Sequence, residues 1–179
     1  GLIVLFDCSE ENLYRVQMEL QHEHDGVQAT AVLGKVQDLR LLDAVFRQYQ
    51  PAVVFHTAAY KHVPLVERNP WQAVGNNIVG SRLLMEAAIL HKVERFVLVS
   101  TDKAVRPTNV MGASKRVTEL LMLAYSQEHW DGCLRPAWRQ ARRGGDPLTR
   151  QAENEPIEHA TRFMGVRFGN VLGSSGSVI

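Results

Sequence analysis

Residues 97–116 read VLVSTDKAVRPTNVMGASKR, and this segment carries a strand, a polar turn and the start of a helix. The apolar run 96–99 predicts a buried strand, and the chain becomes polar at Ser100. Pro107 breaks the chain before a helical pattern that begins near Val110. In open parallel sheets, ligands bind beside the carboxyl ends of the strands. We therefore expect the polar residues after this strand to line a ligand site.

Asp102 and Lys103 lie within this polar turn. A carboxylate and an amine that share a cleft can act as general acid and general base. The alternative is a solvated ion pair on a loop, which is the more common outcome for a single pair of this kind. Lys115 favours the functional interpretation, because a helix that begins near Val110 would direct its side chain back toward the strand end.

Length and composition are those of one globular domain. The 179 residues can bury a sizeable core, and 45% apolar with 22% charged residues is an ordinary balance. The formal net charge of +1 gives no electrostatic case for binding nucleic acid or a membrane surface. Neither the separated cysteines Cys8 and Cys133 nor the pair His22 and His24 has the further ligands of a metal site, so we expect no metal. The sequence has no apolar run long enough to span a bilayer.

Strand and helix patterns alternate along the chain. The runs at 2–6 and 52–56 are continuously apolar, which predicts strands that are fully buried. Residues 128–161 are rich in Arg, Gly, Pro and Glu, and we expect an irregular insertion there. The alternation predicts an α/β fold with a doubly wound parallel sheet and right-handed crossovers. The predicted strands are 2–6, 27–33, 52–56, 96–99 and 162–168, and the predicted helices are 10–22, 39–46, 70–90 and 110–127.

Polar or small residues also follow the first three predicted strands. Asp7 ends the first strand, where an acidic residue can bind an adenosine ribose or, equally, accept a hydrogen bond at a helix N-terminus. Asp38 can cap the next helix. The small side chains of residues 57–59 let a backbone approach a cofactor closely. Lys61 could then reach a phosphate and His62 a sugar hydroxyl, or both could be ordinary loop residues.

Asn77 is a polar residue inside the apolar pattern of the predicted helix 70–90. A buried amide must find hydrogen-bond partners. We expect the polar turn that follows the strand 96–99 to provide them.

Four motifs in order resemble one protein family. They are FHTAAYKHVPLVERNP (55–70), NNIVGS (76–81), RFVLVSTDKAVRPTNVMGASKR (95–116) and RFGNVLGSSGSVI (167–179). Together they resemble the polysaccharide-biosynthesis branch of the extended short-chain dehydrogenase/reductases. That branch includes UDP-N-acetylglucosamine 4,6-dehydratases of bacterial capsule, lipopolysaccharide O-antigen and glycan synthesis. The resemblance, which leaves out 128–161, implies a Rossmann fold, NAD(P) as cofactor, a UDP-N-acetylhexosamine substrate and a lyase reaction.

The resemblance implies catalytic roles for residues of the central segment. Thr101 would bind the C4 oxygen of the sugar, Asp102 would protonate the departing C6 hydroxyl, and Lys103 would take the C5 proton. Lys115 would hold the nicotinamide ribose and favour loss of the C4 hydroxyl proton. Met111 occupies the place of the tyrosine in the family's Tyr-x-x-x-Lys motif, although a thioether cannot take a proton.

The resemblance also implies binding residues. Asn170 would contact the UDP phosphates, His62 the sugar, and Asn77 would brace a loop. Lys35 departs from the small or acidic residue expected beside adenine. The implied cofactor-binding residues are Asp7, Ser9, Lys35, Val36, Thr57, Ala58, Ala59, Lys61, Asn77, Val99 and Lys115.

The resemblance covers only part of an enzyme of this family. The family's first strand and Gly-rich turn, which let the backbone approach a pyrophosphate, have no counterpart before Asp7. We therefore expect residues 1–179 to form a partial dinucleotide-binding domain with an incomplete sheet, which binds NAD(P) weakly by itself. The complete protein would be cytoplasmic and homo-oligomeric, with any membrane anchor upstream of Gly1. Two alternatives stay open, a UDP-sugar 4-epimerase and a non-catalytic Rossmann fragment.

Overall fold

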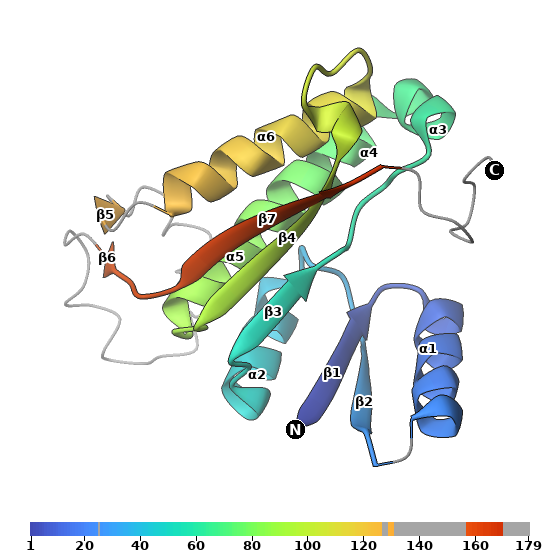
Figure 1. Cartoon of the computed structure of the whole chain (residues 1–179), viewed down its shortest axis with the longest axis vertical. Coiled ribbons are helices and arrows are strands. Elements are labelled where there is room, and N and C mark those ends of the chain that lie inside the picture. The colour runs from blue at the N-terminus through green and yellow to red at the C-terminus, as the bar shows by residue number, and fades with distance from the viewer. Residues whose placement is uncertain (25, 127–128, 131–156, 170–179) are drawn as a thin grey trace.

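The computed structural model describes residues 1–24, 26–126, 129–130 and 157–169. Its helices and strands follow the predicted order, and Figure 1 shows them coloured from blue to red along the chain. The strands are β1 Leu2–Asp7, β2 Gln28–Leu33, β3 Val53–His56, β4 Arg95–Thr101, β5 His129–Trp130, β6 Ile157–Glu158 and β7 Arg162–Phe168. The helices are α1 Glu10–Glu23, α2 Leu39–Tyr49, α3 Val63–Arg68, α4 Pro70–Ala73, α5 Ser81–Leu90 and α6 Val110–Tyr125, with a π-helical segment η1 Val74–Gly80 and a 3₁₀ turn η2 Asp102–Ala104.

Parallel pairing organises the main strands into two sheets. β1 pairs in register with β2, residues 2–7 against 28–33. β4 lies between β3 and β7, with Val97 opposite both Phe55 and Met164. Helices connect these parallel strands, which confirms the predicted α/β fold of Rossmann type. Among the described residues, no ladder of hydrogen bonds joins β1 to β3.

The main hydrophobic core lies between the sheet β3–β4–β7 and the helices α2, α5 and α6 (Figure 1). Phe96 and Leu98 of β4 are fully buried in this core. Phe96 packs against Phe163 of β7 with 5.3 Å between the ring centroids. Because side chains alternate along a strand, Ser100 also points toward this helix layer, and it is buried as well.

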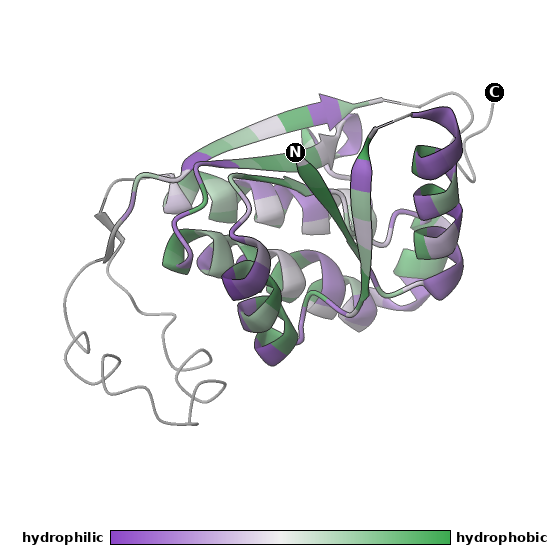
Figure 2. Cartoon of the chain, turned by 90° about the horizontal axis from the view of Figure 1, so that it is seen from below, coloured by the Kyte–Doolittle hydropathy of each residue, from purple (hydrophilic) through white to green (hydrophobic). Residues whose placement is uncertain are grey.

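The strands are less buried than their continuous apolar runs predict. β1 is hydrophobic along most of its length (Figure 2), yet Leu2 is 51% and Ile3 41% exposed. In β3, Phe55 is 70% exposed, while His56 beside it is buried. The prediction of full burial is therefore wrong for these strands. The reason is that α2, α5 and α6 pack against one face of β3 and β4, and α1 packs chiefly against β2.

Side chains that precede the helices define their first turns. Asp38 accepts hydrogen bonds from two backbone N–H groups of α2 at 3.1 Å, as its predicted role of cap requires. Ser9 Oγ accepts from the N–H of Asn12 at 3.3 Å at the start of α1. Asn109 Oδ1 accepts from the N–H of Gly112 at 2.8 Å. This last cap sets where α6 begins and therefore where its lysine lies.

Other segments differ from the prediction. α3 forms in residues 63–68, where we predict no helix, with Pro64 in its first turn. The predicted helix 70–90 is present, but its middle is the π-helical segment η1. The antiparallel pair β5–β6 lies near the ends of the predicted insertion 128–161, most of which falls outside the described residues.

None of the described helices combines the length and apolar character needed to cross a membrane.

Candidate active site

The carboxyl end of β4 holds the predicted acid–base pair. After Thr101 the chain turns into η2, and Asp102 Oδ1 accepts a hydrogen bond from the Thr101 hydroxyl at 2.9 Å. The same oxygen accepts from the backbone N–H of Lys103 at 2.8 Å and from its Nζ at 3.4 Å. The Asp102 side chain is 60% exposed and the Lys103 side chain 39%, so water reaches both. Gly169 follows β7 beside them, and a Cβ there would lie 3.8 Å from Asp102 Oδ2.

These contacts favour the ionised form of Asp102. The Thr101 hydroxyl, followed by Lys103, holds the pKa of Asp102 below its ordinary value. Asp102 is therefore a carboxylate at neutral pH in the free protein. A general acid needs the protonated form, so the surroundings of Asp102 must change before it can donate a proton.

Lys115 lies under the same strand end. Its Nζ donates to the backbone carbonyl of Val99 at 2.8 Å, and the residue is only 7% exposed. Burial lowers the pKa of Lys115 to about 8, and Glu119 opposes this shift from the next turn of α6. The lysine is thus mainly protonated at neutral pH. Because Val99 immediately precedes the polar turn, Lys115 and the acid–base pair share one end of β4.

Met111 packs in the protein interior. It is 4% exposed and lies in an apolar cluster with Val66 of α3 and Ala73 of α4. Gly112 beside it lets α6 approach η2 closely, because a Cβ there would come within 2.5 Å of the Lys103 carbonyl oxygen. Met111 and Gly112 thus hold the start of α6 in place, and neither contributes an acid or a base.

Asn77 is the centre of a buried polar network. Its Oδ1 accepts from the Tyr60 N–H at 2.8 Å, and its Nδ2 donates to the Tyr60 carbonyl at 3.0 Å and to Ser114 Oγ at 2.9 Å. The predicted partners in the polar turn after β4 are therefore wrong. The loop after β3 and the helix α6 supply them instead, because η1 packs against α6. Asn77 thereby ties the Tyr60 loop to the helix that carries Lys115.

His56 is a buried polar group that the sequence did not single out. Its Nε2 lies 2.6 Å from Ser81 Oγ, and the Ser81 hydroxyl donates to the backbone carbonyl of Asn77. Because the serine proton goes to that carbonyl, we assign the His56 tautomer that carries hydrogen on Nε2. Burial, assisted by the charge of Lys115, lowers the pKa of His56 to about 3, so the imidazole is neutral. In the sequence, the feature that could have identified His56 is its position at the end of the apolar run 52–56.

Most of the residues implied for cofactor binding lie at or after the carboxyl ends of β1, β2 and β3, where parallel sheets bind ligands. The others are Asn77 of η1, Val99 of β4 and Lys115 of α6. Asp7 Oδ1 accepts from the N–H of Ser9 at 2.8 Å, and Ser9 rather than Asp7 caps α1. Lys35 is exposed, whereas the side chain of Val36 is buried in the main core. Thr57, Lys61 and His62 are exposed, Ala58 and Ala59 are half-buried, and Asn170 lies outside the described residues.

An ion pair that no local pattern predicts joins α6 to β7. Arg167 Nε and Nη2 donate to the two carboxylate oxygens of Glu119, each at 2.8 Å. The partners are 48 residues apart in sequence. In the sequence, the feature that could have pointed to Glu119 is its position four residues after Lys115, on the same face of the predicted helix.

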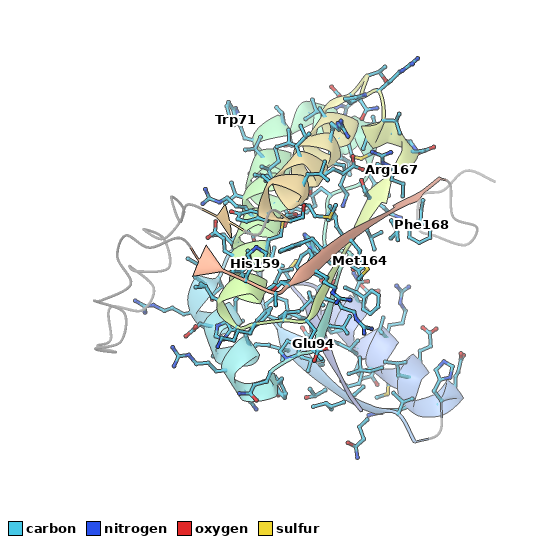
Figure 3. All side chains as sticks on the ribbon, turned by 60° about the vertical axis from the view of Figure 1, so that its left-hand side comes forward. Trp71, Glu94, His159, Met164, Arg167 and Phe168 are labelled. Atoms are coloured by element: carbon cyan, nitrogen blue, oxygen red, sulfur yellow. The ribbon has the colours of Figure 1, made fainter. Side chains whose placement is uncertain are left out.

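A cavity of about 610 Å³ lies at the opposite end of the sheet, with Glu94, Arg95 and Arg162 in its lining. Figure 3 shows Glu94, which precedes β4, and Arg167, near the end of β7, at opposite ends of the sheet. The cavity is therefore separate from the candidate site. Within the described part of the chain, no group of His, Cys, Asp or Glu side chains is arranged to hold a metal ion.

The sequence matches the polysaccharide biosynthesis protein family over residues 1–179. The capsular polysaccharide biosynthesis protein CapD of Staphylococcus aureus is 35% identical over 178 residues, which are 99% of this chain and 25% of that protein. An inverting UDP-N-acetylglucosamine 4,6-dehydratase of Campylobacter jejuni is 33% identical, and a UDP-glucose 4-epimerase of Rickettsia canadensis is 34% identical. Each of these two matches covers 82% of this chain and 35% of the relative.

Solved structures show the same fold. Pen from Bacillus thuringiensis superposes with a TM-score of 0.73 at 29% identity, over 99% of this chain and 44% of that one. MoeE5 in complex with UDP-glucose and NAD gives a TM-score of 0.56 at 21% identity, over 69% of this chain and 49% of that one. The chain thus spans between 25% and 49% of the length of these similar proteins. From the match along its whole length, the chain belongs to the polysaccharide biosynthesis protein family.

Proposed function

We propose that this chain is the cofactor-binding part of an NAD(P)-dependent UDP-N-acetylhexosamine 4,6-dehydratase, a lyase of polysaccharide biosynthesis. The observation that carries the proposal is the end of β4, where Thr101, Asp102 and Lys103 contact one another and Lys115 binds the carbonyl of Val99. The similarity to a dehydratase over 82% of the chain supports it.

The residues at the strand ends fit a dinucleotide. Lys115 uses one of its three N–H donors on Val99, which leaves donors for ribose hydroxyls. Asp7 accepts from Ser9 with one oxygen, and its other oxygen can accept from an adenosine ribose hydroxyl. The presence of NAD in MoeE5, which shares the fold, supports this cofactor. Lys115 and Asp7 would hold the ribose hydroxyls of NAD(P), which would supply the transfer of a hydride from C4 of the sugar to C6.

Asp102 and Lys103 carry out the proton transfers. Entry of the sugar removes water from both side chains, and desolvation favours the neutral forms of a carboxyl and an amine. One proton then moves from Lys103 Nζ to Asp102 Oδ1 across their 3.4 Å contact. The neutral amine takes the C5 proton, while protonated Asp102 gives its proton to the departing C6 hydroxyl, which leaves as water. Reduction at C6 then requires one proton at C5, and solvent supplies the equivalent of the proton lost from the C4 hydroxyl, so the pair keeps the charges with which it began.

Thr101 and Lys115 act on the C4 oxygen and the ribose. The Thr101 hydroxyl donates to Asp102 in the free protein, and it is released when Asp102 becomes protonated. It then donates to the C4 oxygen of the sugar. Because the thioether of Met111 cannot take a proton, the C4 hydroxyl proton passes to solvent, and the positive charge of Lys115 favours its loss.

A UDP-sugar 4-epimerase is the second candidate, because an epimerase relative is as similar as the dehydratase. An epimerase has no elimination across C5 and C6 and therefore no need for the Asp102–Lys103 pair. The test is to incubate the full-length protein with UDP-N-acetylglucosamine and analyse the product. A 4-keto-6-deoxy sugar, which absorbs in alkali, supports the dehydratase. A C4 epimer as the sole product overturns it.

A further inference from the structure

α6 contacts β7 at successive turns, and the contact nearest the candidate site is the ion pair. Near the end of α6, Tyr125 packs on Phe163 with 6.4 Å between ring centroids. One turn earlier, Met122 lies over the middle of β7. One further turn toward the site, Glu119 binds Arg167 through both carboxylate oxygens. The packing of α6 on β7 therefore ends in a fixed negative charge beside the end of the sheet.

The charge on Glu119 is held by several groups at once. The residue is 5% exposed, and Arg167 binds it in a fork while Arg116 Nη1 reaches Oε2 at 3.1 Å. Ser100, opposite Arg167 in the β4–β7 register, lies against the same carboxylate, although its hydroxyl oxygen makes no hydrogen bond of good geometry. Arg167 contributes most to lowering the pKa of Glu119 to about 2. Figure 3 shows Arg167 on the α6 side of β7 and Phe168 on the other side.

The negative charge of Glu119 raises the pKa of Lys115, against the effect of burial. The lysine is nearly as buried as Glu119, and burial alone favours the neutral amine. From β3 the lysine faces His56, which is neutral, and from β4 the uncharged carbonyl of Val99. Charged groups of other elements packed near α6 are paired elsewhere, namely Asp102 with Lys103, Glu67 with the Val110 N–H, and Glu86 with Arg82.

We propose that Glu119 is a positioning residue of the active site, which keeps Lys115 charged at the Val99 carbonyl and docks the end of β7 beside Asp102. This inference rests on the proposed function, in which Lys115 holds the nicotinamide ribose. Glu119 touches neither cofactor nor sugar and acts through Lys115. Without its charge the buried ammonium loses a stabilising Coulomb interaction from the next turn of the same helix, and the pKa of Lys115 falls further.

The test measures the titration of Lys115 in the full-length protein. Acetic anhydride modifies only neutral amines, so the labelling rate of Lys115 between about pH 6 and pH 10, followed by mass spectrometry of its peptide, reports the midpoint. We expect Glu119→Gln to move the midpoint down by about 1 pH unit, roughly a tenfold change in the ionisation constant. The decline of turnover at high pH should shift in the same direction. A midpoint equal to that of the parent protein overturns the inference.

Two further variants separate this role from damage to the fold. Glu86→Gln removes a buried glutamate that pairs with Arg82 at the α5–α6 contact, and it should leave the Lys115 midpoint unchanged. Arg167→Gln removes a cation and should move the midpoint up, the opposite direction, which also serves if Glu119→Gln does not fold. A downward or absent shift in Arg167→Gln overturns the inference. Because labelling needs no substrate, shifts in the expected directions combined with absent dehydratase activity would refute the proposed function instead.

Discussion

Two pairs of opposite charges lie near the end of β4, and they differ in solvent exposure. The Asp102–Lys103 pair is open to water and joined by one 3.4 Å contact. The Glu119–Arg167 pair joins a carboxylate that is 5% exposed to an arginine side chain that is 45% exposed, through a fork of two 2.8 Å hydrogen bonds. A weak pair with an exposed carboxylate can change its protonation when a ligand displaces water, whereas a strong pair with a buried carboxylate keeps its charge. In the proposed mechanism the Asp102–Lys103 pair transfers protons, whereas the Glu119–Arg167 pair fixes the position of β7 against α6.

Removing either member of the exposed pair should have the largest effect on activity. We expect Asp102→Asn and Lys103→Ala in the full-length protein each to lower turnover by about 10²-fold or more, the usual size for general acid–base groups. Because both side chains are exposed, the melting temperature should stay close to that of the parent. Steady-state kinetics and a thermal melt measure both. Near-normal turnover in both variants would remove the pair from the mechanism.

Removing the buried carboxylate of the Glu119–Arg167 pair should instead change how the free energy of unfolding depends on pH. The pKa of Glu119 is lowered to about 2 in the folded protein from an ordinary value of 4.5, so its contribution is present above pH 4.5 and is lost as pH falls toward 2. We expect this contribution to be about 3 kcal/mol. Denaturant unfolding from about pH 6 to pH 3 should show a shallower acid decline in Glu119→Gln than in the parent. Equal acid slopes would mean that the pair is no stronger than the exposed one.

A variant of Asn77 shows how much a buried neutral network contributes to stability, for comparison with the Glu119–Arg167 ion pair. Asn77→Ala leaves the Tyr60 backbone groups without their amide partner, which should cost about 2 kcal/mol of unfolding free energy. Hydrogen exchange at the Tyr60 amide should accelerate, because its N–H loses the bond to Oδ1. The control is Asn69→Ala, since Asn69 is exposed and its amide donates to the Leu65 carbonyl at 2.9 Å, away from the Asn77 network. Equal destabilisation by the two variants would contradict a special role for Asn77.

The smallest effect is expected at Met111. Met111→Leu preserves volume in the cluster with Val66 and Ala73, so it should cost less than about 1.5 kcal/mol and leave turnover within about twofold. Chemical denaturation and steady-state assays measure these two quantities. A large loss of turnover with unchanged stability would show that Met111 contributes to the chemistry after all.

Local patterns predicted the parts of the protein that depend on neighbouring residues. The cap at Asp38, the strand predicted at 96–99 and the start of α6 at Val110 each rest on residues a few positions apart, although β4 extends to Thr101. The helix α3 was missed, because its short span offers too few turns for a periodic pattern. The exposure of Phe55 was also missed, because it depends on which sheet face the helices cover.

The sequence by itself determined the order of strands and helices and placed Thr101, Asp102 and Lys103 at a strand end, because hydrophobic periodicity and caps act over one or two turns of chain. Only the tertiary structure decided that Asn77 binds Tyr60, 17 residues away, and that Glu119 binds Arg167, 48 residues away. These contacts exist because η1 and β7 pack against α6. Such packing is a property of the whole assembled fold, and no short stretch of sequence records it.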